Sequence, residues 1–301
     1  MRKKILSSKF IKERRLGIIM ALPAVFFIAL VMLFPMAQSF WISLHDWEFL
    51  QPASEQIFSG FDNYLYILKD SAFQDSFRLT MIFTVSAVVL EMVLALAIAL
   101  LLNRDFWGRG FVRTLALLPW AVPSVVNGIM WKWMLNPRYG ALNGLLAAMG
   151  LIDRYIIWLG DKELAMFMVI LADVWKETPF IMLLILAALQ TIPKDLYEAS
   201  KVDGANKLQN LFYITIPLIQ PVIFVSIALR TIWALKSFDL IYTLTAGGPS
   251  NGTTVMGYYT YLKAFISLDF GKGSAVAYIM TLLVLVLVVI YQKLIYKEVN
   301  N

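Results

Sequence analysis

Six long apolar runs constrain the fold of this 301-residue chain more than any other feature. A helix needs about 20 apolar residues to cross the roughly 30 Å hydrocarbon core of a bilayer. All six runs are long enough, and they lie at about residues 17–40, 79–102, 112–135, 164–190, 217–237 and 274–296. They are continuous and rich in Leu, Ala and Met, without the alternation of membrane β-strands. The sequence therefore predicts an all-α polytopic membrane protein with six transmembrane helices.

The first run is expected to stay in the protein as a membrane span. It is too long for a cleaved signal peptide, it carries Pro23 and Pro35, and no small-residue cleavage site follows it. We therefore predict a polar N-terminal segment at residues 1–16, a transmembrane domain at residues 17–296 and a short tail at residues 297–301.

The distribution of Lys and Arg predicts the orientation of the spans. Residues 1–15 hold seven Lys and Arg and one acidic residue. All segments on this side together hold 15 basic and 6 acidic residues, against 7 basic and 11 acidic residues on the other side. Cytoplasmic loops of membrane proteins carry an excess of Lys and Arg. We therefore expect both termini, and the loop at residues 191–216, to lie in the cytoplasm.

That cytoplasmic loop is much longer than a turn between two spans requires. Pro193 is suited to the start of a helix, and Gly204 is suited to its end. Asn206 and Gln209 have the three-residue spacing of a capping box at the start of a second helix. The loop is thus expected to form two short helices joined at Gly204.

Two hypotheses account for such a pair of helices. In the first, the helix docks into a groove of another protein, with Glu198 as a charged anchor and the small Ala199 and Ser200 allowing close approach. In the second, it is an amphipathic helix that rests on lipid. The physical chemistry of the loop alone is compatible with both.

The chain lacks the residues of most catalytic and metal sites. It has no Cys and a single histidine, His45, so we assign no catalytic and no metal-ligating residues. His45 is expected to be solvated at the outer membrane interface. No G-x-x-x-x-G-K-[ST] phosphate loop occurs, so this chain has no evident means of hydrolysing ATP. The net charge of +6 is dispersed near the membrane ends, and no nucleic acid partner is expected.

Polar residues gather in the middle of three runs, where ionisable groups by default face a cavity or a partner. Pro119 and Pro123 are expected to disrupt the backbone at this level, as around transporter substrate sites. The helical faces concerned comprise Trp120, Ser124 and Asn127 in the third run, Asp173, Lys176, Glu177 and Phe180 in the fourth, and Ser226, Arg230, Trp233, Ala234 and Ser237 in the fifth.

These mid-membrane charges allow two interpretations. Arg230 and Lys176 can pair with Asp173 and Glu177 and so lock the helices together. Alternatively, the groups line a polar cavity for a hydroxyl-rich solute such as a sugar, which carboxylates, guanidinium groups and indole rings suit. One residue can serve both purposes.

Glu91, in the middle of the second run, is expected to be protonated or hydrogen-bonded to another helix, with Lys132 and Arg230 as its basic neighbours by depth.

A different class of function, an ion- or proton-coupled secondary transporter, would use Glu91, Asp173 and Glu177. It predicts internal inverted repeats, which the sequence does not display. A membrane-embedded enzyme would need a catalytic constellation that the sequence does not offer.

Four motifs together carry a family resemblance. Glu198-Ala199-Ser200, Gly204 and Ile214-Thr215-Ile216-Pro217 match the spacing of the "EAA" signature Glu-Ala-Ala-x3-Gly-x9-Ile-x-Leu-Pro, departing at Ser200 and Ile216. The other three are Leu-Pro-Trp-Ala-Val-Pro-Ser at 118–124, Trp-Lys-Glu-Thr-Pro-Phe at 175–180 and Leu-Thr-Ala-Gly-Gly-Pro at 244–249. With these motifs, residues 15–297 resemble permease subunits of ATP-binding cassette (ABC) importers, in the carbohydrate-uptake branch and closest to the maltose-type first permease.

The resemblance implies a type I ABC importer permease fold in a prokaryotic inner or plasma membrane. It implies ATP-driven, binding-protein-dependent import of a di- or oligosaccharide, with this chain forming half of the pathway. The implied partners are a second homologous permease in a heterodimer, two nucleotide-binding ATPase subunits that carry ATP and Mg, an extracellular solute-binding protein, a carbohydrate and the lipid bilayer. The chain itself is expected to bind no cofactor and to be no enzyme.

The resemblance also implies two sets of site residues. The set that couples the loop at residues 191–216 to the ATPase comprises Glu198, Ala199, Ser200, Asp203 and Gly204. The set that matches the sugar-contact positions of the maltose-type family comprises Trp120, Ser124, Asp173, Lys176, Glu177, Arg230, Ala234 and Ser237. Several of the latter positions are small or amide residues in the maltose transporter and are charged here, which leaves open the exact sugar and allows an acidic or differently oriented substrate.

Overall fold

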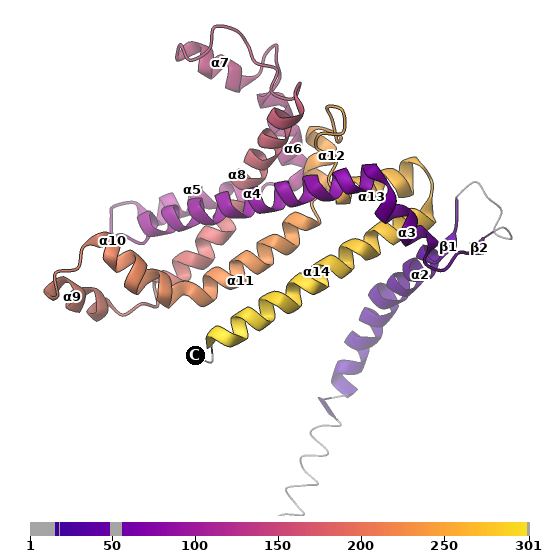
Figure 1. Cartoon of the computed structure of the whole chain (residues 1–301). Helices are drawn as coiled ribbons and strands as arrows, with labels where there is room; N and C mark the ends of the chain where they lie inside the picture. Colours follow the sequence, from indigo (N-terminus) through magenta and orange to yellow (C-terminus); the bar gives the residue numbers. More distant parts are fainter. Residues whose placement is uncertain (1–15, 18, 49–55, 300–301) are drawn as a thin grey trace, which may run out of the picture. The chain divides into compact units, whose positions relative to one another are not determined.

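The computed structural model of the protein describes residues 16–17, 19–48 and 56–299. The basic segment 1–15 and the last two residues of the predicted tail lie outside the described residues. The described chain is mostly helical (Figure 1), as the apolar runs predicted. It divides into two compact units, one formed by the residues up to 67 with residues 263–278, and one by residues 68–262 with those from 279 onward.

The first unit combines a long helix, a two-stranded hairpin and parts of later helices. The long helix spans Ile19–Ser43 and contains a π-helical stretch. In the hairpin, His45 pairs with Phe58 and Asp46 with Ile57 in antiparallel register. The elements are the π-helical stretch η1 (Ala29–Leu33), α2 (Phe34–Ser43), β1 (His45–Asp46), β2 (Ile57–Phe58), most of α3 (Asp62–Lys69), most of η4 (Leu262–Ile266) and the start of α14 (Phe270–Val299).

His45 is buried in the first unit, so its expected position as a solvated side chain was wrong. It is 8% exposed. Its Nδ1 lies 2.7 Å from the Trp41 carbonyl oxygen, and its ring centroid lies 3.8 Å from that of Trp41. The buried Asn63 carboxamide donates to the carbonyl oxygens of Ser43 and His45, at 3.0 and 2.9 Å. Hydrogen bonds within this small unit thus bury a residue that the sequence alone places in solvent.

The second unit contains most of the helices of the described chain. Its longest members are 32 and 28 residues long. The helices are α4 (Ser71–Leu102), α5 (Arg109–Ala121), α6 (Ser124–Met134), α7 (Ala141–Ala148), α8 (Lys162–Leu189), α9 (Lys194–Val202), α10 (Lys207–Asn210), η3 (Leu211–Thr215), α11 (Ile216–Leu235), α12 (Asp239–Leu244), α13 (Met256–Tyr261) and the later part of α14.

Helices α4, α8 and α11 pack against one another at the centre of this unit (Figure 1). Ala87, Glu91, Ala95 and Ala99 follow one another at four-residue intervals along α4, and all four are fully buried. Small residues at such spacing let helix backbones approach closely in a membrane, where packing rather than water exclusion drives association. The single large member of this stripe, Glu91, therefore lies inside the helix interface.

Two apolar clusters lie at different levels of this interface. One includes Phe83, Val169 and Leu244 and joins α4, α8 and α12. The other includes Ala95, Ile185 and Ile219 and joins α4, α8 and α11. The mid-membrane charges lie between these two levels along α4 and α8, where the apolar packing is interrupted.

Four of the described helices are long and apolar enough to cross a membrane, and a fifth span results if α5 and α6 are taken together. The axes of α5 and α6 differ by 94°, with the break at Val122 and Pro123, so the predicted disruption of the third run is confirmed. The predicted span at residues 164–190 is helical as α8, but it carries three charged residues at its centre, Asp173, Lys176 and Glu177. The count of six spans stays a prediction.

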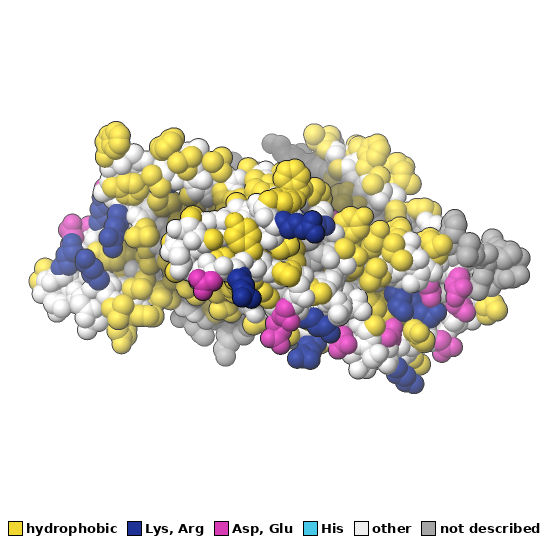
Figure 2. Space-filling model, turned by 90° about the horizontal axis from the view of Figure 1, so that it is seen from above, with side chains coloured by type: hydrophobic (Ala, Val, Ile, Leu, Met, Phe, Trp, Pro, Cys, Tyr) yellow, Lys and Arg dark blue, Asp and Glu magenta, His cyan; other side chains and the backbone are white. Residues whose placement is uncertain are grey.

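The surface of the protein matches a membrane environment. Hydrophobic side chains cover much of the face seen in Figure 2, while charged side chains form small separate groups. Along α4, for example, Val85, Val89 and Val93 are each more than half exposed. Apolar surface of this extent marks contact with lipid or with another protein.

Candidate functional sites

A polar cavity of about 320 Å³ lies between α6, α8, α11 and α12. Pockets that hold small ligands range from about 300 to 1,000 Å³, so its size is in the range for a ligand. Six of the eight sugar-contact residues predicted from the sequence line it. The lining residues are Ser124, Asn127, Asp173, Lys176, Glu177, Arg230, Trp233, Lys236, Ser237, Phe238, Asp239 and Leu240.

The bend between α5 and α6 places the first of these residues. Val122 is extended, Pro123 caps α6, and Ser124 begins the new helix at the cavity wall. Asn127, which is fully buried, donates from Nδ2 to the Ala172 carbonyl oxygen at 3.1 Å. Its Oδ1 has no hydrogen-bond partner among the described residues. The bend thus leaves a buried acceptor at the cavity.

Close packing of α6 on α12 depends on one glycine. A Cβ atom at Gly128 would overlap the side chain of Thr243, with a separation of 2.8 Å from its Cβ atom. Because contacts shorter than 3.0 Å between such atoms essentially never occur, only glycine lets α12 lie this close. This contact fixes the α12 side of the cavity, where Asp239 and Leu240 lie.

Three buried charged residues join the central helices. Arg230 of α11 donates to both carboxylate oxygens of Glu91 on α4, from Nε at 2.5 Å and from Nη2 at 2.8 Å. The same Nη2 also donates to Asp173 Oδ2 on α8. Glu91, Arg230 and Asp173 are 0%, 2% and 7% exposed. Bidentate pairs of arginine and carboxylate are the stronger kind of charged hydrogen bond.

A second pair lies beside this triad. Lys176 Nζ donates to Glu177 Oε1 at 2.6 Å. The expectation that Arg230 and Lys176 pair with neighbouring acids is therefore confirmed, with Glu91 as the additional partner of Arg230. Glu91 is hydrogen-bonded to another helix, which was one of its two expected roles. The charged residues thus form ion pairs and also belong to the cavity wall, because four of these five residues line the cavity.

Two of the predicted sugar-contact residues lie elsewhere. Ala234 is 1% exposed and belongs to the apolar cluster between α4 and α8. Trp120 stacks on Phe180 with ring centroids 5.3 Å apart, and Phe180 in turn lies 5.2 Å from the ring of Trp233. Trp120 therefore reaches the cavity wall only through other aromatic rings.

The predicted sugar-contact set omitted four charged or aromatic residues that line the cavity, namely Trp233 on the polar face of the fifth run, and Lys236, Phe238 and Asp239 after it. Lys236, Phe238 and Asp239 lie where α11 ends and α12 begins. The signal that could have found them is their position directly after the polar face of the fifth run. They could not be assigned to the cavity from the sequence, because the apolar pattern does not encode the turn that brings α12 back toward α6.

The cytoplasmic loop forms the predicted pair of helices joined at a glycine. Pro193 caps α9, and Gly204 adopts a left-handed φ of +80° directly after it. Asn206 Oδ1 accepts from the backbone N–H groups of Leu208 and Gln209 at 3.0 and 2.9 Å. Gln209 Oε1 accepts from the Asn206 N–H at 2.7 Å, which completes the capping box.

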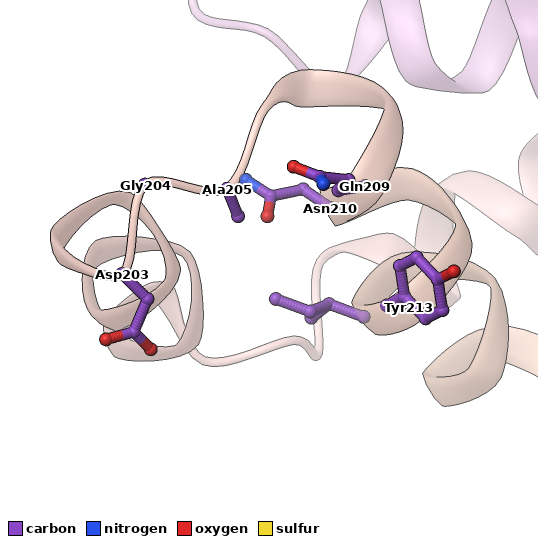
Figure 3. A pocket seen from close by; sticks show the side chains of 7 residues that line it. Asp203, Gly204, Ala205, Gln209, Asn210 and Tyr213 are labelled. Carbon is purple, nitrogen blue, oxygen red and sulfur yellow. The ribbon is translucent and has the colours of Figure 1, made fainter.

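A pocket of about 280 Å³ opens between the end of α9 and the start of the next helices. Figure 3 shows Asp203 and Gly204 on one side of it, with Asn210 and Tyr213 on the other. Asn210 Oδ1 is buried and has no hydrogen-bond partner among the described residues. The pocket thus combines an exposed carboxylate with a buried acceptor.

Four of the five residues predicted to couple this loop to an ATPase are exposed, and the fifth is not. Ser200 is 8% exposed and donates to the Tyr197 carbonyl oxygen at 2.9 Å. The Tyr197 hydroxyl in turn lies 2.9 Å from Thr215 Oγ1. Ser200 therefore faces its own chain. The exposed predicted residues are Glu198, Ala199, Asp203 and Gly204.

Large apolar side chains surround the same loop without being covered by this chain. They are Leu196, Val202, Leu208, Phe212 and Tyr213, which are 41%, 88%, 66%, 56% and 80% exposed. Two short helices with this much uncovered apolar area form a surface that lipid or another protein can cover. No group of three or more His, Cys, Asp or Glu residues with the arrangement of a metal site occurs within the described ranges.

Comparison with known proteins identifies the family. Residues 91–300 match the model of the family described as "binding-protein-dependent transport system inner membrane component". The chain belongs to this family. It is therefore a multi-pass inner-membrane component of a transport system, and the permease role inferred from the four motifs is confirmed.

Individual relatives extend the match over almost the whole chain. The permease is 41% identical over 283 residues to the trehalose/maltose transport system permease protein MalF of Thermococcus litoralis, covering 94% of each chain. It is 34% identical to the sulfoquinovosyl glycerol transport system permease protein SmoG of Agrobacterium fabrum, covering 94% of this chain and 91% of that one.

A solved structure confirms the fold of the permease. The crystal structure of a bacterial ABC transporter involved in the import of the acidic polysaccharide alginate matches with a TM-score of 0.82 and 26% identity. The match covers 96% of this chain and 98% of the other. The ABC importer permease fold expected from the sequence is thus correct.

Proposed function

We propose that this permease forms half of the translocation pathway of an ATP-driven, binding-protein-dependent carbohydrate importer. The observation that carries the proposal is the polar cavity, in which carboxylate, guanidinium, ammonium, amide and hydroxyl groups surround a space of about 320 Å³ between membrane helices. Such groups make the paired hydrogen bonds that a sugar requires, and Trp233 adds an aromatic ring. Two relatives are named for the transport of sugars, which supports the same class of solute.

In this proposal, the loop at residues 191–216 transmits the conformational change of the ATPase subunits to the membrane helices. The permease has no phosphate loop of its own, so ATP and Mg belong to two separate nucleotide-binding subunits. The exposed Glu198, Asp203 and Gly204 and the uncovered apolar side chains around them form the surface on which such a subunit docks. A helix-in-groove contact of this kind needs both apolar anchors and an orienting charge.

The remaining partners follow from the same proposal. A second, homologous permease supplies the other half of the pathway in a heterodimer. An extracellular solute-binding protein delivers sugar to the outer loops, including residues 136–163 and 244–263. Both termini lie in the cytoplasm, with the six spans and the boundaries predicted from the sequence.

The decisive experiment replaces Gly204 by Asp in the complete transporter reconstituted in proteoliposomes. A β-carbon at Gly204 meets no other atom, so the substitution acts through the left-handed φ and the added charge at the docking surface. We expect sugar uptake and sugar-stimulated ATP hydrolysis to fall to background, with normal membrane insertion. Glu198→Lys, which inverts the orienting charge, is expected to have the same effect.

Gly108→Asp is the matched control. Gly108 also has a positive φ, of +79°, and open space around its β-carbon, but it precedes α5 and lies outside the loop at residues 191–216. The control is expected to leave ATP-driven uptake close to that of the unmodified transporter. Normal uptake in both loop variants would refute the coupling assignment, and uptake driven by an ion gradient without ATP would favour a secondary transporter.

A further inference from the structure

Glu91 is a charged residue of the mid-membrane cluster that does not line the cavity. It is fully buried on α4, and both of its carboxylate oxygens accept hydrogen bonds from Arg230. Arg230 does line the cavity. Glu91 therefore acts on the cavity from behind its wall, chiefly through the guanidinium group that it holds.

The charged residues that line the cavity balance one another, and Glu91 is not among them. The acids that line the cavity are Asp173, Glu177 and Asp239, and the bases that line it are Lys176, Arg230 and Lys236. As the carboxylate that its two hydrogen bonds from Arg230 indicate, Glu91 adds one formal negative charge directly behind this guanidinium group, within 2.8 Å of its nitrogens. The cavity with its supporting residue thus carries one more formal negative charge than positive charges.

The hydrogen bonds that Arg230 and Lys176 already make also disfavour the binding of an anion. Nε and Nη2 of Arg230 are engaged by Glu91 and Asp173, and Nζ of Lys176 is engaged by Glu177. An anion would have to compete with these carboxylates for both cations. It would also place further acceptor atoms beside the unpartnered Oδ1 of Asn127.

An uncharged polyol meets none of these obstacles. A hydroxyl group both donates and accepts, so it can donate to carboxylate or amide oxygens that a phosphate, sulfonate or carboxylate group cannot satisfy at neutral pH. Burying an unpaired charge costs far more free energy than burying a hydroxyl group with a hydrogen-bond partner. The cavity is therefore better matched to neutral hydroxyl groups than to anions.

We propose that Glu91 is a positioning residue that sets the charge specificity of the cavity. By holding and neutralising Arg230 from behind, it makes the permease accept neutral di- and oligosaccharides and reject sugars that carry phosphate, sulfonate or carboxylate groups. The inference rests on the proposed carbohydrate transport and goes beyond it. Relatives named for sulfoquinovosyl glycerol and for the acidic polysaccharide alginate show that family membership leaves this choice open.

The test measures binding to the complete transporter in nanodiscs without its solute-binding protein, so that only the membrane cavity selects. The neutral probes are trehalose, maltose and maltotriose, and the anionic probes are sn-glycerol 3-phosphate, sulfoquinovosyl glycerol and an alginate disaccharide. The unmodified transporter is expected to bind the best neutral probe at least tenfold more tightly than any anionic probe.

Glu91→Gln removes the charge and keeps the size of the side chain. We expect it to reduce the ratio of neutral to anionic affinity about tenfold, which corresponds to about 1.4 kcal/mol. Glu91→Asp is expected to restore most of the ratio. The double substitution Glu91→Gln with Arg230→Gln keeps the charge balance, so it should retain the preference for neutral probes at lower affinity. Glu163→Gln, in the first turn of α8, is the matched control and should leave the ratio unchanged.

The possible outcomes separate this inference from the proposed function. Equal binding of neutral and anionic probes by the unmodified transporter would overturn the inference while leaving carbohydrate transport intact. An unchanged affinity ratio in a folded Glu91→Gln variant would overturn it as well, since a merely structural residue would lower both affinities alike. Failure of the transporter to bind or take up any probe of either class would instead overturn the proposed function.

Discussion

The loop of α9 and α10 and the mid-membrane cavity are held together by contacts of very different range. In the loop, the capping box joins residues three positions apart, and the longest of its side-chain hydrogen bonds, from Tyr197 to Thr215, spans 18 positions. In the cavity, Arg230 reaches Asp173 over 57 positions and Glu91 over 139. The loop therefore keeps its form through local contacts while its surface stays open, whereas the cavity exists only when helices far apart in the sequence are assembled.

This difference predicts that the two regions respond differently to substitution. Damage at the cavity should destabilise the whole bundle, because each partner removed leaves a buried charge on another helix. Damage at the loop should impair coupling and leave the bundle stable. The substitutions below test this contrast, from the largest expected effect to the smallest.

Arg230→Ala should have the largest effect on stability. It leaves the carboxylates of Glu91 and Asp173 buried without their cation, and breaking a buried pair in this way costs about 3–5 kcal/mol. Thermal unfolding of the purified complex in detergent would show a large loss of stability. Arg109→Ala breaks the exposed pair with Asp105 and should change stability by about 0–1 kcal/mol. Equal losses in both variants would contradict the view that the buried triad holds the helices together.

Gly128→Ala should have an intermediate effect. The new methyl group would overlap Thr243 on α12, and overpacking of this kind costs about 1–3 kcal/mol. Because the displaced helix carries part of the cavity wall, we also expect weaker sugar binding. Gly144→Ala is the control, since its β-carbon would meet only the Tyr155 hydroxyl at an ordinary 3.9 Å. Unfolding temperature and sugar affinity measured on both variants would reveal whether the close α6–α12 contact matters.

Asn206→Ala should have the smallest effect on stability and a selective effect on function. Loss of an N-cap costs about 1 kcal/mol, and here the loss is confined to the short helix α10. We expect slower sugar-stimulated ATP hydrolysis with an almost unchanged unfolding temperature. Asn206→Asp keeps a capping oxygen and should behave like the unmodified protein. A large drop in the unfolding temperature for Asn206→Ala would contradict this contrast, because it would mean that the loop contributes to the stability of the helix bundle.

The features that could be predicted from the sequence are those with local causes. The apolar runs predicted helices because backbone groups inside a bilayer must satisfy one another within a segment. Pro193, Gly204, Asn206 and Gln209 predicted the shape of the loop because capping and left-handed φ angles are decided within a few residues. Pro123 predicted the break in the third run for the same reason.

The features that only the tertiary structure decided depend on which distant side chains meet. Sequence spacing placed Ala234 and Arg230 on one helical face, yet only the packing of α4 shows that Ala234 is buried in the core and Arg230 turns to Glu91. Likewise, Asp239 becomes part of the cavity because α12 folds back against Gly128. A one-dimensional pattern reports the depth of a charge in the membrane but not its partner. The assignment of Glu91 to Arg230, and with it the charge balance of the cavity, therefore required the assembled helices.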